Sequence, residues 1–143
     1  FLPPPIMKEI VYPFYKLAVA EIKRYKQVPI IFHSDGDLNK VMGEIVESGF
    51  DGIQSLQPSA GMDLTHIKKE YGDDITLMGN IDLDHVMTFA SPEEVEEVVK
   101  RTIDIAAPGG GFILSTCNTF IDAIKPENAL AMYKTAHEYG IYK

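Results

Sequence analysis

The sequence predicts an α/β protein built as a parallel barrel of the TIM type, (β/α)8, of which this chain would form about four consecutive strand–helix units. Four short apolar segments of strand length alternate with longer segments of helical periodicity. A helix between two strands makes a right-handed crossover, so the strands are expected to be parallel. Polar residues gather after the strands, which is where such barrels carry their functional groups.

The first expected helix and strand lie near the start of the chain. Residues 6–26 have helical periodicity, and Pro13 should kink or divide this helix because proline lacks an N–H. The apolar residues near one face of the helix are Ile10, Phe14, Leu17 and Ile22. Residues 28–32 form a continuous apolar run, typical of a strand buried on both faces, and residues 33–37 are expected as a turn.

The same unit then repeats along the chain. The further expected strands are residues 52–56, 75–78 and 112–115. The further expected helices are residues 38–48, 64–71, 92–107 and 126–140. Asp63 and Ser91 are the expected N-caps of the second and third of these helices, because their side chains accept hydrogen bonds from free N–H groups. Residues 79–82 are expected as the turn after the third strand.

A doubly wound open sheet is the competing fold. It would normally carry a Gly-rich phosphate-binding turn after its first strand. Here the corresponding residues 33–37 (HSDGD) are polar and acidic. We therefore expect residues 1–143 to form a single domain that amounts to half of an eight-stranded barrel.

The composition indicates an ordinary globular domain without nucleic-acid or membrane partners. The chain has 143 residues and a net charge of −8, and a diffuse acidic surface disfavours nucleic acid. No apolar run is long enough to span a membrane. The single cysteine, Cys117, fits a reducing compartment, and without a visible signal peptide we expect a cytoplasmic protein. The chain begins with Phe1 instead of Met, so we expect further sequence upstream.

The candidate site residues lie near or after the carboxyl ends of the expected strands. They are His33, Asp35, Asp37, Gln54, Gln57, Asn80, Asp82, Cys117, Asn118 and Asp122. The loops that lead into the strands are less rich in such groups. This asymmetry favours an active face at the strand ends, although turns favour Asp, Asn and Gly for conformational reasons as well.

Two pairs of residues and the cysteine each have a functional and an ordinary interpretation. His33 and Asp35 could be metal ligands or a base held by a carboxylate, or a histidine in a polar layer beside an Asx turn. Cys117 could be a zinc or thiol position together with His33, or a small buried hydrophobe. Asn80 and Asp82 could hold a polar substrate group or form a polar turn.

Seven segments carry a resemblance to a known family. They are residues 29–37 (PIIFHSDGD), 47–53 (ESGFDGI), 60–64 (AGMDL), 71–82 (YGDDITLMGNID), 91–94 (SPEE), 108–114 (PGGGFIL) and 126–128 (PEN). In order and spacing they resemble the C-terminal part of the uroporphyrinogen decarboxylase superfamily. This resemblance implies a TIM-type barrel whose first four strands lie upstream, so the N-terminal half of the barrel would be absent from this chain.

The decarboxylases of this superfamily remove acetate carboxylates from a tetrapyrrole without a cofactor. The resemblance implies that their essential Asp and anion-binding Arg residues would lie in the absent N-terminal half. Their C-terminal contribution is a His after the last strand, in a Leu-Gly-His-Gly pattern. Here Cys117 or Asn118 stands in that place, a departure from the decarboxylase pattern.

The corrinoid-dependent methyltransferases of the superfamily activate a thiol with zinc. They bind the metal through His-x-Cys after strand five and a Cys after strand eight. His33 matches the first ligand, Cys117 roughly matches the last, and Asp35 stands where the first Cys would be. A carboxylate is a chemically suitable zinc ligand. In this interpretation the cofactors are zinc and a corrinoid, with a methyl-corrinoid as the substrate.

Three hypotheses follow. The first is the C-terminal half of a decarboxylase-type enzyme, inactive alone, with His33 and Asp35 as candidate catalytic residues and upstream groups transferring the proton. Its expected substrate-binding residues are Asp37, Gln57, Asn80, Asp82 and Asn118. The second is the zinc methyltransferase. The third is a non-catalytic homodimer or binding module, because a half barrel exposes two raw sheet edges.

Overall fold

The computed structural model describes residues 2–141 and shows an α/β fold around one parallel sheet. The four strands are β1 (Ile31–Ser34), β2 (Gly52–Ser55), β3 (Thr76–Ile81) and β4 (Phe112–Thr116). They pair in parallel in the order β1-β2-β3-β4. The predicted alternation of strands and helices is therefore confirmed. Phe1, where we expect sequence to continue upstream, lies outside the described residues.

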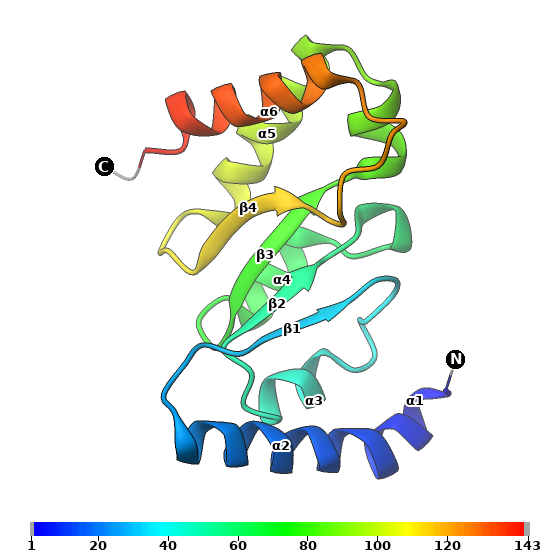
Figure 1. Cartoon of the computed structure of the whole chain (residues 1–143), viewed down its shortest axis with the longest axis vertical. Helices are drawn as coiled ribbons and strands as arrows, with labels where there is room; N and C mark the ends of the chain where they lie inside the picture. The colour runs from blue at the N-terminus through cyan, green and yellow to red at the C-terminus, as the bar shows by residue number, and fades with distance from the viewer. Residues whose placement is uncertain (1, 142–143) are drawn as a thin grey trace.

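The helices leave one face of the sheet open. In chain order they are α1 (Pro4–Ile6), η1 (Met7–Val11), α2 (Tyr12–Tyr25), α3 (Met42–Glu47), η2 (Pro58–Ala60), α4 (Leu64–Tyr71), η3 (Leu83–Met87), α5 (Pro92–Ala106) and α6 (Pro126–Tyr139). Figure 1 shows α4 behind the sheet, α3 between the β1 edge and α2, and α6 beside α5. Right-handed crossovers between adjacent strands put their helices on the same side, which explains this arrangement. No helix in residues 2–141 is long and apolar enough to cross a membrane.

Two hydrophobic clusters form the core on the covered side of the sheet. The first packs α3 and α4 against β1, β2 and β3, with Ile45, Ile53 and Leu77 fully buried. The second packs α5 and α6 against β3 and the residues after β4, with Ile81 and Val99 fully buried. Burying one such side chain stabilises the fold by about 1.5–3 kcal/mol.

Both predicted N-caps are confirmed. Asp63 accepts the N–H groups of Thr65 at 2.9 Å and His66 at 3.4 Å, at the start of α4. Ser91 and Glu94 form a reciprocal capping box at the start of α5, with N–H to oxygen distances of 2.7 and 3.3 Å. These caps satisfy N–H groups that have no partner within the helix.

Two strands extend further at their carboxyl ends than predicted. His33 and Ser34 belong to β1 instead of a turn, because they pair with residues Gln54 and Ser55 of β2. The expected turn at residues 79–82 is also wrong in its first part, because β3 continues to Ile81. Pairing with a neighbouring strand, which sequence patterns do not reveal, set both ends.

The helix at the start of the chain buries a different face from the one predicted. Ile10, Phe14, Leu17 and Ile22 are all exposed, whereas Tyr12 and Val19 are buried. Tyr15 makes edge contacts with the rings of Phe32 and Phe50, which sets the rotation of α2. The helix is thus apolar on two sides, and only one side meets the described core.

The expected break at Pro13 takes the form of a change in helix type. The π-helical segment η1 ends immediately before α2, and Pro13 occupies the first turn of α2. A wider turn relieves the position where proline offers no N–H.

The next predicted helix is shorter than expected, since residues 38–41 form a turn, yet Leu38, Val41, Met42 and Ile45 are buried as its apolar spacing indicated.

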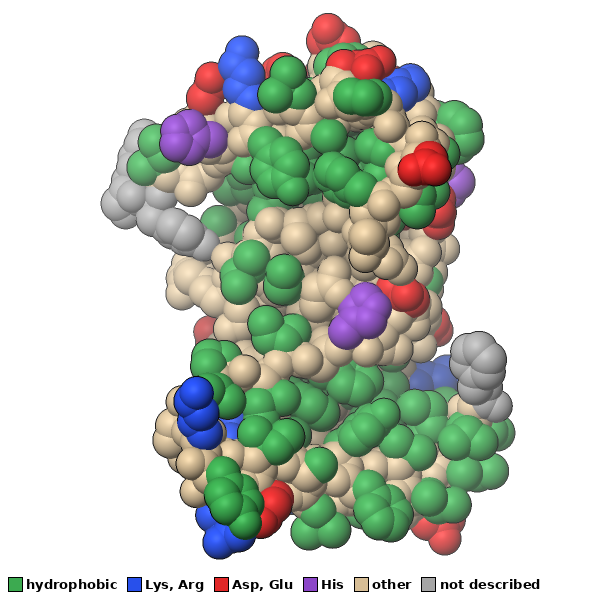
Figure 2. Space-filling view, viewed as in Figure 1, with side chains coloured by type: hydrophobic (Ala, Val, Ile, Leu, Met, Phe, Trp, Pro, Cys, Tyr) green, Lys and Arg blue, Asp and Glu red, His purple; other side chains and the backbone are tan. Residues whose placement is uncertain are grey.

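The open face of the sheet explains why β1 is not buried on both sides. Exposure alternates along β1, and Ile31 on the open face is 45% exposed. Ile113 of β4 is equally exposed, whereas Ile53 on the covered face is fully buried. Figure 2 shows hydrophobic side chains spread over this open face. Apolar groups here have no covering element among residues 2–141.

Candidate functional site

Asp35 is the centre of a polar network at the carboxyl ends of the strands. It follows β1, and its Oδ1 accepts a hydrogen bond from the Ser55 hydroxyl at the end of β2, at 2.9 Å. Its Oδ2 accepts one from the side-chain amide of Asn118, after β4, also at 2.9 Å. Both carboxylate oxygens are therefore held by groups from two other parts of the chain, and the carboxylate has a fixed orientation.

His33 lies beside this carboxylate and is held by Gln54. The His33 Nδ1 atom contacts Gln54 Oε1, and Gln54 Nε2 donates to the carbonyls of Thr116 at 3.2 Å and Cys117 at 3.4 Å. His33 Nε2 is 3.8 Å from Asp35 Oδ2, which is too long for a direct hydrogen bond. The contacts that run from His33 through Gln54 to the end of β4 thus hold an imidazole next to an oriented carboxylate.

The backbone around the network holds several left-handed residues. Ser55 and Leu56 at the end of β2 have φ of 106° and 51°, and Asn80 in β3 has φ of 76°. Gly79 has φ of 126°, and a Cβ placed there would lie 2.4 Å from the Ser55 carbonyl oxygen. The Asn80 side chain donates to the Leu56 carbonyl at 2.6 Å. Strained backbone of this kind clusters at functional sites.

Three other predicted site residues hold loops together. Asp37 accepts the Asn39 N–H at 2.9 Å, as in an Asx turn. Asp82 caps η3 through His85 at 2.7 Å, and Gln57 accepts the Gly36 N–H at 3.3 Å. The structure therefore brings His33, Asp35 and Asn118 together, whereas Asp37 and Asp82 shape the surrounding loops.

The sequence indicates Gln54 as a candidate site residue but not its contact with His33, and it does not indicate Ser55 at all. Gln54 stands out in the sequence only as a polar residue in an apolar strand, and Ser55 has no distinguishing feature. The parallel register pairs His33 with Gln54 and Ser34 with Ser55. That register is the signal that identifies them, and it is visible only once the strands are aligned.

Cys117 does not join His33 and Asp35. Its side chain is 3% exposed and packs in the second hydrophobic cluster. Burial raises the pKa of the Cys117 thiol, and the carboxylates of Asp82 and Asp84 raise it further, so the thiolate is disfavoured. Within residues 2–141 no three His, Cys, Asp or Glu side chains are gathered in a way that could hold a metal ion. The zinc set that the sequence suggested does not fit this arrangement.

Two neighbouring hollows adjoin the network. The first has a volume of about 400 Å³ and is lined by His33, Gln54, Met78, Ser115, Thr116, Asn118 and Thr119. The second, of about 250 Å³, is lined by Gln57, Leu83, Asp84, Cys117, Asn118, Thr119, Phe120 and Ile121. Neither is lined by a lysine or an arginine, so the polar groups along this wall are carbonyls, amides, hydroxyls, an imidazole and the Asp84 carboxylate.

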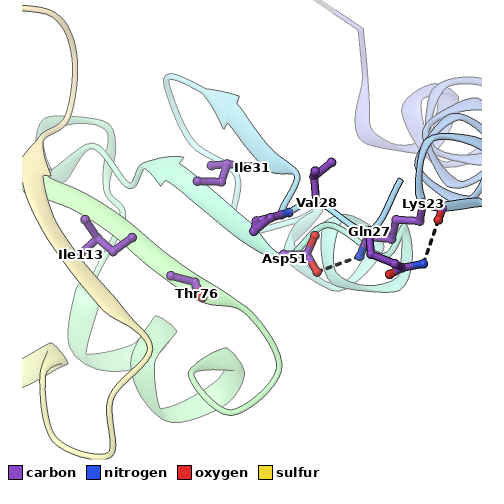
Figure 3. Close-up of a pocket in the computed structure, with 8 residues that line it drawn as sticks. Lys23, Gln27, Val28, Ile31, Asp51, Thr76 and Ile113 are labelled. Carbon is purple, nitrogen blue, oxygen red and sulfur yellow. Dashed lines mark hydrogen bonds and ion pairs between the residues drawn. The ribbon is translucent and has the colours of Figure 1, made fainter. Parts of the chain in front are cut away.

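A third hollow lies at the opposite, amino ends of the strands. It has a volume of about 480 Å³, and Figure 3 shows Ile31, Thr76 and Ile113 along it. Its Lys23 and Asp51 form an ion pair at 2.7 Å. Because its charged groups neutralise each other and the rest is largely apolar, we place the site at the carboxyl ends.

Comparisons with known proteins agree on one family of sequences. The family model described as uroporphyrinogen decarboxylase (URO-D) matches residues 1–139. The uroporphyrinogen decarboxylase of Methylococcus capsulatus is 28% identical over 115 residues, covering 80% of this chain and 31% of that protein. The enzyme of the same name from Alkalilimnicola ehrlichii is 28% identical over 117 residues, covering 79% and 29%. The chain spans about a third of the length of these relatives.

The comparison with solved structures concerns the fold. A methyltransferase from Methanosarcina mazei superimposes with a TM-score of 0.81 at 15% sequence identity. The match covers 99% of this chain and 39% of the methyltransferase chain. The four parallel strands and their helices therefore correspond to part of a larger fold of this kind.

Proposed function

The chain belongs to the uroporphyrinogen decarboxylase family, and we propose that it forms the C-terminal part of an enzyme that removes carboxylates from a tetrapyrrole. Its share of the work would be one wall of the substrate cleft at the carboxyl ends of the strands. The observation that carries this proposal is the Asp35 carboxylate, held by Ser55 and Asn118 beside His33. An oriented carboxylate and imidazole next to a hollow are expected at a substrate-binding site, and holding a loop in place does not require them.

In this proposal residues 1–143 are the last four units of a TIM-type (β/α)8 barrel and form a single domain with an N-terminal half supplied upstream. The sequential strand order, the helices on the covered face and the apolar open face support it. In a closed barrel the open face would become the filled interior, and the free edges of β1 and β4 would find partners.

The chain's own residues would bind and orient the substrate. Asp35 accepts hydrogen bonds, Asn118 is anchored to it, and Asn80 lies at the end of the neighbouring β3. Decarboxylation breaks a carbon–carbon bond, releases CO2 and leaves a carbon that takes up a proton, and it needs no cofactor here. Since neither hollow is lined by a cation, the substrate carboxylates and the proton transfer fall to groups outside this chain.

The methyltransferase alternative needs a zinc-bound thiol site, and the buried Cys117 gives it no support. The non-catalytic alternative, two copies closing against each other, would cover the same open face. Size-exclusion chromatography at low concentration tests it, since a monomer would contradict a structural dimer.

The direct test measures CO2 release and the mass of the product when the intact protein is incubated with uroporphyrinogen. We expect turnover by the intact protein and none by the isolated 143-residue chain. An intact protein that binds stoichiometric zinc, loses it on His33→Ala, and moves a methyl group from methylcobalamin to a thiol without decarboxylating uroporphyrinogen would overturn the proposal.

A further inference from the structure

We infer that Gln54 is a positioning residue that keeps His33 in the Nδ1–H tautomer, so that Nε2 faces the hollow as a hydrogen-bond acceptor. The site would then take a ligand group that donates N–H hydrogen bonds and would reject a carboxylate. This inference rests on the proposed function only in assuming that the hollow beside His33 belongs to the substrate cleft.

The first step is the orientation of the Gln54 side-chain amide. One end of it lies within hydrogen-bond distance of the carbonyl oxygens of Thr116 and Cys117. Carbonyl oxygens only accept, so the amide end facing them must be the NH2 group. The carbonyl end of Gln54 is therefore the atom that contacts His33.

The second step fixes the proton on the imidazole. Gln54 Oε1 only accepts, so His33 Nδ1 must be the donor in their contact. A neutral imidazole carries a single N–H, so Nε2 keeps its lone pair. The carbonyls of Thr116, the last residue of β4, and of Cys117, which follows it, thus set the histidine tautomer through Gln54.

The Nδ1–H tautomer of His33 leaves two hydrogen-bond acceptors side by side. His33 Nε2 and Asp35 Oδ2 lie 3.8 Å apart, with no hydrogen bond between them. Asp35 cannot turn away without losing Ser55 or Asn118. A ligand group with two N–H bonds, such as an amidine or an amine, can reach both acceptors at once. A carboxylate would meet two acceptors and no lysine or arginine along the hollow.

Nitrogen NMR on the intact protein with ¹⁵N-labelled histidine tests the tautomer. His33→Gln identifies the His33 signals by their loss. We expect a pyrrole-type shift for Nδ1 and a pyridine-type shift for Nε2 near neutral pH. Gln54→Leu should shift the ring toward the Nε2–H form, because a leucine offers Nδ1–H no acceptor.

Gln27→Leu is the matched control, because Gln27 donates to the Lys23 carbonyl at the far end of the strands. It should leave the His33 signals unchanged. An Nε2–H tautomer in the unaltered protein, or an unchanged tautomer in a folded Gln54→Leu variant, would overturn the inference. If Gln54→Leu does not fold, the tautomer of the unaltered protein still decides.

Benzamidine and benzoate, which share a shape, test the ligand class. Benzamidine should shift the His33 signals and bind at least about tenfold more tightly than benzoate, and Gln54→Leu should weaken it about tenfold, as expected for one hydrogen bond. Equal or tighter binding of benzoate contradicts the inference. Neither readout needs turnover, so a failure to decarboxylate uroporphyrinogen would count against the proposed function alone.

Discussion

The Ser55 hydroxyl donates a 2.9 Å hydrogen bond to Asp35 Oδ1, and so ties the end of β2 to the loop after β1. Ser55 is fully buried and has φ of 106°, while the Asp35 side chain is 46% exposed. A buried, conformationally costly residue thus supports an exposed carboxylate. This combination is expected where a fold holds a functional group in place.

Ser55→Ala should therefore affect activity more than stability. Losing one hydrogen bond should lower the free energy of unfolding by about 1 kcal/mol. Decarboxylation by the intact protein should fall by about tenfold, because Asp35 keeps only Asn118 as an anchor and loses its fixed orientation. Urea unfolding and steady-state rates measure the two effects. The control is Ser34→Ala, since the Ser34 hydroxyl contacts only the Asp35 main-chain carbonyl. Equal rates for the two variants would contradict the prediction.

Gly79→Ala should be among the most destabilising single changes in the chain. The new Cβ would lie 2.4 Å from the Ser55 carbonyl oxygen, and φ of 126° is unfavourable for any side chain. We expect a loss of about 3 kcal/mol in the free energy of unfolding, measured with urea. Gly61→Ala is the matched control, since φ is 87° there but nothing lies within 4 Å of its Cβ. It should cost about 1 kcal/mol. Similar losses for both would show that β2 and β3 are not so close.

Cys117 should react slowly with thiol reagents in the folded protein. Burial raises the pKa of its thiol, so the reactive thiolate is scarce at neutral pH. Labelling should accelerate sharply when urea unfolds the protein. In the folded protein it should accelerate only when the pH is well above the ordinary thiol pKa. Because the folded-state pKa is raised, the thiol's contribution to stability is fully present below the unfolded pKa and is lost as pH rises through the folded pKa. Cys117→Ala should remove this alkaline loss, and rapid labelling at pH 7 would contradict the prediction.

Local signals in the sequence predicted the helix ends and much of the core. Asp63 and Ser91 cap their helices as their residue types indicated, because a cap involves only neighbouring residues. Leu38 and Ile45 are buried as predicted although α3 is shorter, because apolar spacing survives a change from helix to turn.

The ends of the strands and the contacts of the candidate site depend on groups that are distant along the chain. Gly79 and Asn80 have the composition of a turn, and both have positive φ, yet they continue β3 because they pair with Leu114 and Ser115 of β4. The link from Asn118 to Asp35 joins residues far apart in sequence, and no local pattern encodes it. Cys117 was weighed as a ligand from its place after a strand, but its side chain packs into the core on the covered side.

Phe14→Glu in the intact protein tests whether a further part of the barrel covers α2. Phe14 is 68% exposed in this chain, and it lies on the apolar side of α2 that meets no described core residue. If the upstream half packs there, an unpaired carboxylate would be buried, and the free energy of unfolding should fall by roughly 2 kcal/mol or more. Lys16→Glu, an exposed change on the same helix, should stay within about 0.5 kcal/mol. Urea unfolding of both variants measures the difference. Equally small losses would mean that the apolar side of α2 stays in solvent, and the half-barrel proposal would then lack its expected interface.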